Sequence, residues 1–157
     1  MNSAHQHLLI NHFPIIALIL AVLIMLIGIL SKSSVTRRVA LLLFFIAGVC
    51  ALPSMATGEG AEEIVEHIEG IDHDLIEAHE HHAQTMMPFM WGIIVLSLIG
   101  LFLEWKKKSM AMIASVTVLL VGMIATYFAR EVGTSGGAIS HPEIRKGYKM
   151  PAHEEHS

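Results

Sequence analysis

The chain has 157 residues, of which 54 % are apolar and 15 % are charged, and its formal net charge is −4 with histidine neutral. A soluble domain carries about 25 % charged residues, and a chain this short has too small an interior to bury the apolar excess. The composition therefore excludes an ordinary soluble globular domain. The single cysteine, Cys50, excludes an intrachain disulfide.

Four apolar stretches follow one another along the chain, and each is long enough for a membrane-spanning helix, which needs about 20 residues. They cover residues 13–30, 39–56, 86–103 and 110–129, and none contains Asp, Glu, Lys or Arg. None shows the polar stripe of a helix in a soluble bundle. We therefore expect an all-α fold, an integral membrane four-helix bundle. It would form one domain over residues 1–144, followed by a polar tail over residues 145–157.

Basic residues mark one side of this expected bundle. Lys32, Arg37 and Arg38 lie in the connection after the first stretch, and residues 106–108 are three lysines after the third. The long connection over residues 53–85 has no Lys or Arg but nine acids. Short basic connections stay in the cytoplasm. We therefore expect a multi-pass protein of the bacterial cytoplasmic (inner) membrane, with both termini and the acidic connection on the outer, periplasmic side.

The outer connection is expected to be helical. Thr57 can cap a short amphipathic helix that ends at Glu69, with Gly70 in the position after its end. Such a helix would lie on the membrane surface or on the bundle. Asp72 can cap a second helix that continues into the third span. Residues 57–85 are thus predicted as two helices.

The eleven histidines all fall in segments expected on the outer side. His79 and His82 lie one helical turn apart before the third span, and His12 lies where the first span begins. His141 follows the fourth span after a flexible glycine turn, residues 136–137. If the helices close into a bundle, these four converge at its outer mouth. The other histidines are His5, His7, His67, His73, His81, His153 and His156.

Three interpretations of the histidines remain open. In the first, His12 and either His79 or His82, from different helices, clamp a b-type haem (haem b) in an apolar slot. The haem would be non-covalent, because the chain has no Cys-x-x-Cys-His motif. A haem near the outer surface would suit electron transfer with a periplasmic redox partner.

In the second interpretation, histidines and carboxylates hold a divalent transition metal such as zinc, copper, nickel or iron. The ligands would come from the outer helices and from the segment after the fourth span: Glu63, His67, His79, His82, and either His12 or His141. The protein would then be a metal sensor, a metal chaperone or a metal-dependent membrane enzyme.

In the third interpretation, the histidines are polar groups at the membrane surface, and the protein is an accessory structural subunit of a larger membrane complex. A homo-oligomer in the lipid bilayer fits each interpretation. Catalysis by a serine nucleophile is not expected, and there is no phosphate-binding Gly-x-x-x-x-Gly-Lys. A redox role is therefore favoured over hydrolysis. The acidic outer face disfavours nucleic acid as a partner.

Residues 7–15, HLLINHFPI, resemble the opening of a family of small four-helix membrane proteins of unknown function, in which a His is followed by four residues and then His-Phe-Pro. Residues 57–63 (TGEGAEE), 79–80 (HE) and 137–144 (GAISHPEI) are similar to the same family. Leu8 stands where the family more often has proline. The resemblance implies a four-span fold and no activity. It marks His7, His12, His79 and His141 as outward positions. His7 thereby joins the candidate metal ligands.

Overall fold

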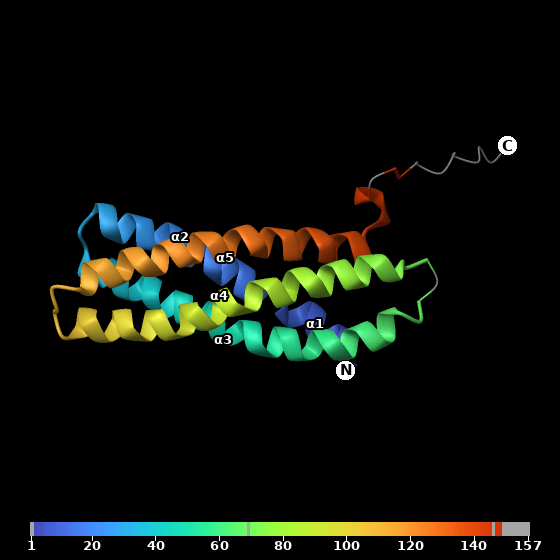
Figure 1. Ribbon diagram of the computed structural model, residues 1–157, viewed down its shortest axis with the longest axis horizontal. Coiled ribbons are helices and arrows are strands. Elements are labelled where there is room, and N and C mark those ends of the chain that lie inside the picture. Colours follow the sequence, from blue (N-terminus) through green and yellow to red (C-terminus); the bar gives the residue numbers. More distant parts are fainter. Residues whose placement is uncertain (1, 69, 146, 149–157) are drawn as a thin grey trace.

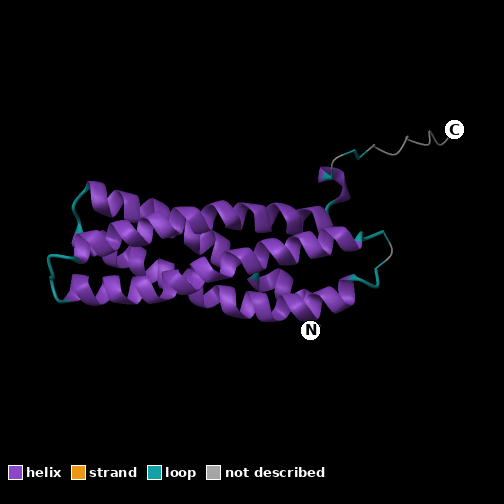
Figure 2. Cartoon of the chain, viewed as in Figure 1, coloured by secondary structure: helices purple, strands orange, loops and turns teal. Residues whose placement is uncertain are grey.

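The protein is all-helical in the computed structural model, which describes residues 2–68, 70–145 and 147–148. Its elements are α1 (Ser3–Ile10), α2 (His12–Leu30), α3 (Ser34–Val65), α4 (His73–Trp105), α5 (Ala111–Ser140) and the short 3-10 helix η1 (Pro142–Ile144). Figure 2 shows helices and loops along the described chain. Four helical segments are long and apolar enough to cross a membrane, with α1 and α2 together forming one of them. The expected all-α class and the four candidate spans are confirmed.

Helices α2, α3, α4 and α5 form an antiparallel bundle in which each packs on the next and α5 packs back on α2 (Figure 1). α1 packs mainly on α3. The α2–α3 and α4–α5 connections lie together at one end, which we call the basic end (Figure 1). The N-terminus, the α3–α4 connection and η1 lie at the opposite end, which we call the histidine end.

Small residues let the helices approach closely in the middle of the bundle. A Cβ added at Gly122 of α5 would lie 2.7 Å from Cζ of Phe44 on α3. One added at Gly100 of α4 would lie 2.8 Å from Cδ2 of Leu41 on α3. Phe44 and Leu41 are fully buried. The glycines thus open the space that large side chains of α3 fill, as small residues do between closely packed membrane helices.

The outward faces of the same helices are also apolar. Leu23, Leu42, Val95, Leu98 and Leu120 are each between 48 % and 55 % exposed. A protein surrounded by water rarely exposes so large an apolar surface. The fold is therefore compatible with a multi-pass membrane protein.

The prediction that a separate short helix begins at Thr57 is wrong, because α3 runs unbroken to Val65. Its expected last residue, Glu69, lies outside the described residues. Thr57 donates its hydroxyl to the carbonyl of Pro53, 2.8 Å away, and so bonds within α3 rather than capping a new helix. Thr favours helix caps and Pro favours helix ends, but these preferences act only between neighbouring residues. The packing of α3 on α1 and α4 outweighs them, and Ala61, which follows Thr57 on α3, is only 8 % exposed.

Two other expectations at the histidine end have opposite outcomes. Asp72 caps α4 as predicted, since its side chain accepts from the backbone N–H of Asp74 at 3.1 Å. The prediction of a flexible glycine turn after the fourth span is wrong, because α5 continues through residues 136–137 to Ser140. Gly136 packs against the ring of His79 instead. The missing Cβ therefore serves a close contact and not a turn.

A buried ion pair joins α3 to α4 at the basic end. Arg37 donates from Nε to Oε1 of Glu104 at 2.5 Å, and the two side chains are 9 % and 3 % exposed. The sequence places Arg37 in the connection after the first span, but α3 already begins at Ser34. Glu104 directly follows the third apolar stretch, and the sequence pattern assigned it no role.

Gly122→Ala should destabilise the bundle, because the added Cβ meets the Phe44 ring and overpacking costs about 1–3 kcal/mol. Gly92→Ala is the matched control, since a Cβ there meets no atom within 4 Å and alanine favours a helix. We expect the thermal midpoint in detergent to fall for Gly122→Ala and to stay equal or rise for Gly92→Ala. Adding Phe44→Leu should restore part of the loss, and equal midpoints for all variants would contradict this packing.

Glu104→Ala should lower the free energy of unfolding by about 3–5 kcal/mol, because it leaves the buried Arg37 charge without a partner. Glu131→Ala is the control: its partner, Arg130, has a side chain 76 % exposed, and exposed pairs contribute about 0–1 kcal/mol. Denaturant unfolding followed by circular dichroism measures both. A loss for Glu104→Ala no larger than the control's would mean that the pair is not buried in solution.

Candidate functional site

A cavity of about 420 Å³ opens at the histidine end. This volume lies within the range of small-molecule sites, about 300–1,000 Å³. All five α-helices contribute to its walls, and apolar side chains such as Ile15, Met86 and Val132 form much of the lining. Four histidines also lie on its walls: His7, His12, His79 and His141.

His7 reaches this cavity from α1 and is held by α3. Its Nδ1 lies 3.0 Å from the carbonyl oxygen of Ser54. A carbonyl can only accept a hydrogen bond, so Nδ1 donates, and the neutral ring keeps its lone pair on Nε2. A Cβ added at Gly58 would lie 3.4 Å from Cε1 of this ring. That is an ordinary van der Waals distance, so the ring lies beside Gly58 without requiring a glycine there.

His79 is held in the same manner between α4 and α5. Its Nδ1 lies 3.0 Å from the hydroxyl of Ser135, which itself donates to the carbonyl of Glu131 at 2.9 Å. A hydroxyl has one proton, so Ser135 accepts from Nδ1 and leaves the lone pair of His79 on Nε2. A Cβ added at Gly136 would lie 3.0 Å from Cε1 of His79. Gly136 therefore leaves room for the His79 ring.

The His7 and His79 rings, both on the cavity wall, lie edge to face, with centroids 6.4 Å apart and planes at 81°. A metal–imidazole bond is about 2.0 Å long, which puts each ring centroid about 3 Å from a bound metal. Two imidazoles that hold one metal between them therefore have centroids about 6 Å apart. Edge-to-face aromatic contacts cover the same range, about 4.5–7 Å. The separation is thus compatible with direct packing and with a shared metal.

Burial keeps both rings in the neutral form near pH 7. They lie outside the four apolar stretches, on the outer turns of α1 and α4. Burial lowers the pKa of His79 below its usual 6.5, and the nearby His7 and His82 lower it further. Burial also lowers the pKa of His7, which its hydrogen bond to Ser54 partly offsets. The neutral imidazole is the form that ligates a metal.

His12 and His141 lie on the rim of the cavity, and both are exposed. Nδ1 of His141 lies 2.9 Å from Oε1 of Glu143. Hydrogen bonds from its own backbone N–H and from His141 lower the pKa of Glu143. The two rim histidines are therefore accessible to solvent, in contrast to the half-buried pair.

The other candidate residues do not line the cavity. His67 is exposed, and its Nδ1 lies 2.8 Å from the backbone carbonyl of Glu63, which is also exposed. His82 is half-buried, and its Nδ1 has no hydrogen-bond partner among the described residues. His153 and His156 lie outside the described residues. Within residues 2–68, 70–145 and 147–148, no group of three or more His, Cys, Asp or Glu side chains is arranged to hold a metal ion.

Sequence reasoning assigned no site role to three carboxylates on the cavity wall: Glu59, Glu62 and Glu80. Burial and the neighbouring Glu80 raise the pKa of Glu62. Glu80 accepts a hydrogen bond from Nε2 of Gln84 at 2.7 Å. Glu59 and Glu62 are three residues apart, so the helical period puts them on one face of α3. This spacing indicates a shared helix face only if α3 continues past Thr57, which the sequence did not predict.

Residues 133–137, Gly-Thr-Ser-Gly-Gly, match the letters of the Gly-x-Ser-x-Gly motif. The motif activates serine only on a sharp strand-to-helix turn. Here the segment lies inside α5, and the hydroxyl of Ser135 bonds to its own helix and to His79. The structure therefore gives this serine a positioning role.

Comparison with protein-family models, with curated proteins and with solved structures found no match to this chain. The resemblance carried by residues 7–15 therefore rests on its motif alone. The geometry of the cavity is therefore the main indication of function.

The two half-buried histidines should make stability depend on pH. Because the folded pKa of His7 and of His79 lies below the unfolded value of about 6.5, the unfolded chain binds more protons in that window, and stability falls as the pH drops below 6.5. We expect the thermal midpoint to fall less between pH 7.5 and 5 in His7→Gln/His79→Gln than in the wild type. His5→Gln/His81→Gln, with exposed histidines on the same two helices, is the control and should keep the wild-type slope. Identical slopes in all three proteins would contradict the burial described.

Proposed function

We propose that the protein binds a b-type haem at its histidine end and takes part in electron transfer, with His7 and His79 as the two axial ligands. The observation that carries the proposal is a pair of half-buried imidazoles on different helices, with ring centroids 6.4 Å apart, each with Nδ1 hydrogen-bonded and with no partner for Nε2 among the described residues. The sequence alone put His12 in the place that His7 takes here. His12 lines the same cavity, but its side chain is exposed.

Two features of the cavity support haem over a bare metal ion in this proposal. Haem iron needs only two ligands from the protein, because the porphyrin supplies the others. A zinc-type ion needs three or four protein ligands, and the described residues gather no such group. The largely apolar lining also favours a flat, apolar group over a hydrated ion.

The surrounding residues would fix the ligands. The carbonyl of Ser54 and the hydroxyl of Ser135 hold the tautomer and orientation of the two rings, as outer partners of metal-bound histidines do. The apolar lining residues would limit the access of water to a haem held there. A haem with two histidine ligands supplies one-electron redox chemistry. Carboxylates on the wall would favour its oxidised, more positive state.

The same proposal places the protein in a membrane. The four apolar helices would span the bacterial cytoplasmic membrane with the basic end in the cytoplasm, because short basic connections are retained there. The histidine end would then face the periplasm. A periplasmic redox protein, or a larger membrane complex, would be the electron-transfer partner.

Full-length protein purified from haem-replete cells should show a Soret band that shifts on reduction. His7→Gln and His79→Gln should each remove it, and Ser135→Ala should weaken haem binding about tenfold or more, because it removes an outer partner of His79. His5→Gln and His81→Gln, on the same two helices, should leave the band intact.

Three outcomes would contradict this assignment. A colourless preparation would overturn the haem proposal, and a stoichiometric metal ion found by elemental analysis would replace it with the metal interpretation. Loss of the Soret band on His12→Gln but not on His7→Gln would return the first ligand to His12. Circular dichroism of each variant separates loss of haem from loss of fold.

A further inference from the structure

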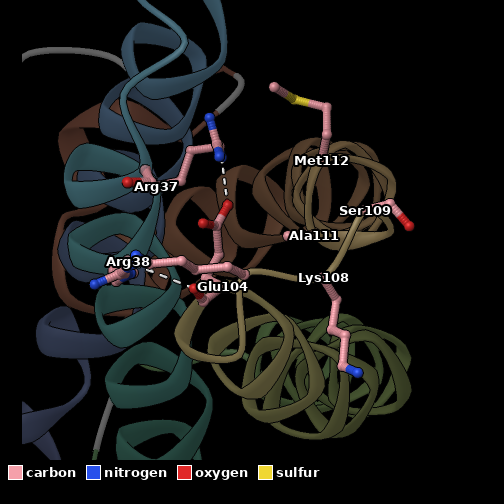
Figure 3. A pocket seen from close by; sticks show the side chains of 9 residues that line it. Arg37, Arg38, Glu104, Lys108, Ser109, Ala111 and Met112 are labelled. Carbon is pink, nitrogen blue, oxygen red and sulfur yellow. Dashed lines mark hydrogen bonds and ion pairs between the residues drawn. The ribbon is translucent and has the colours of Figure 1, made fainter.

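A second pocket, of about 320 Å³, lies at the basic end, where α3 and α5 begin and α4 ends. Figure 3 shows Arg37 and Arg38 of α3 directed towards Glu104, with Ala111, the first residue of α5, on the other side of Glu104. It shares no residue with the cavity at the histidine end. A ligand bound there would therefore not compete with a haem for side chains.

Basic groups outnumber acidic ones in this pocket. Four basic side chains line it, Arg37, Arg38, Lys107 and Lys108, against the single carboxylate of Glu104. Glu104 is already engaged by Nε of Arg37. The remaining positive charge is available to an anion.

Two buried arginine nitrogens of the pocket residues have no hydrogen-bond partner among the described residues. The Arg37 side chain is 9 % exposed, and its Nη1 has no hydrogen-bond partner among the described residues. Arg38 donates from Nη2 to the backbone carbonyl of Glu104 at 3.2 Å, and its buried Nε likewise lacks a partner in the described chain. Buried polar groups are normally satisfied, so unpaired donors on two arginines indicate a missing acceptor.

The start of α5 points to the same kind of ligand. This 30-residue helix begins at Ala111, which lines the pocket, and its N-cap residue, Met110, makes no side-chain capping bond. The N-terminus of a long helix attracts negative charge through its free N–H groups and its dipole. The start of α5 and the two arginines therefore line one pocket.

We propose that this pocket binds a phosphate group. Arginine recognises phosphate through paired N–H donors, and lysine adds charge without fixed geometry. The phosphate could belong to an anionic phospholipid, since the pocket lies at the end of apolar helices, where basic pockets hold lipid head groups. Free inorganic phosphate has the same chemistry, and the experiment below separates the two sources.

The test uses the full-length protein in neutral detergent. Native mass spectrometry compares the retention of phosphatidylglycerol with that of phosphatidylcholine, and the thermal midpoint is followed as inorganic phosphate is added at constant ionic strength. The pocket variant is Arg38→Gln/Lys108→Gln. The matched control is Lys32→Gln/Lys106→Gln, which removes the same charge from lysines outside the pocket. If the pocket variant fails to fold, Lys107→Gln/Lys108→Gln replaces it, since both lysines are exposed.

We expect phosphatidylglycerol to be retained over phosphatidylcholine, with a loss of about tenfold or more in the pocket variant and none in the control. That result assigns the site to a lipid phosphate. A rise in thermal midpoint with inorganic phosphate, absent in the pocket variant, with equal retention of the two lipids, assigns it to a free phosphate. Equal retention of the lipids with no response to phosphate overturns the proposal, as does an equal loss in the pocket variant and the control.

Discussion

The low polarity of the bundle's middle is the constraint on which the rest of the structure depends. A charged side chain among apolar helices is costly unless it is paired, so ionisable groups collect where the apolar stretches end. The Arg37–Glu104 pair marks this boundary at the basic end, since both groups are buried and each neutralises the other. The described imidazoles and the acids beside them collect at the opposite end. The two ends of the bundle therefore carry different ionisable groups, separated by the apolar middle.

Helix length then gives the cavity at the histidine end its walls. α4 has 33 residues and is therefore about 50 Å long, whereas the hydrocarbon core of a bilayer is about 30 Å thick. The surplus turns of α3, α4 and α5 extend past the apolar stretches, and α1 packs on α3 beside them. The cavity reaches from these extended turns into the ends of the apolar stretches, and its walls are mainly helices. A site on such walls holds its side chains in fixed positions.

Glycine has one physical role at two depths of the bundle. Gly122 makes room for Phe44 in the core, and Gly136 makes room for the His79 imidazole at the histidine end. In both cases the missing Cβ lets a ring lie close to a neighbouring helix. The hydrogen bond from His79 to Ser135 lies beside this close contact. The site is thus an extension of the way in which the core is packed.

The sequence by itself determined the four apolar helices, the gathering of histidines outside them and the cap at Asp72, because hydropathy and capping act over neighbouring residues. It failed at Thr57, where packing on other helices decides whether α3 continues. Only the tertiary structure decided that His7, rather than His12, faces His79, and that Arg37 meets a carboxylate 67 residues away. Such pairings depend on how each helix is rotated and shifted against its neighbours. The periodicity of a single helix carries no information about that placement.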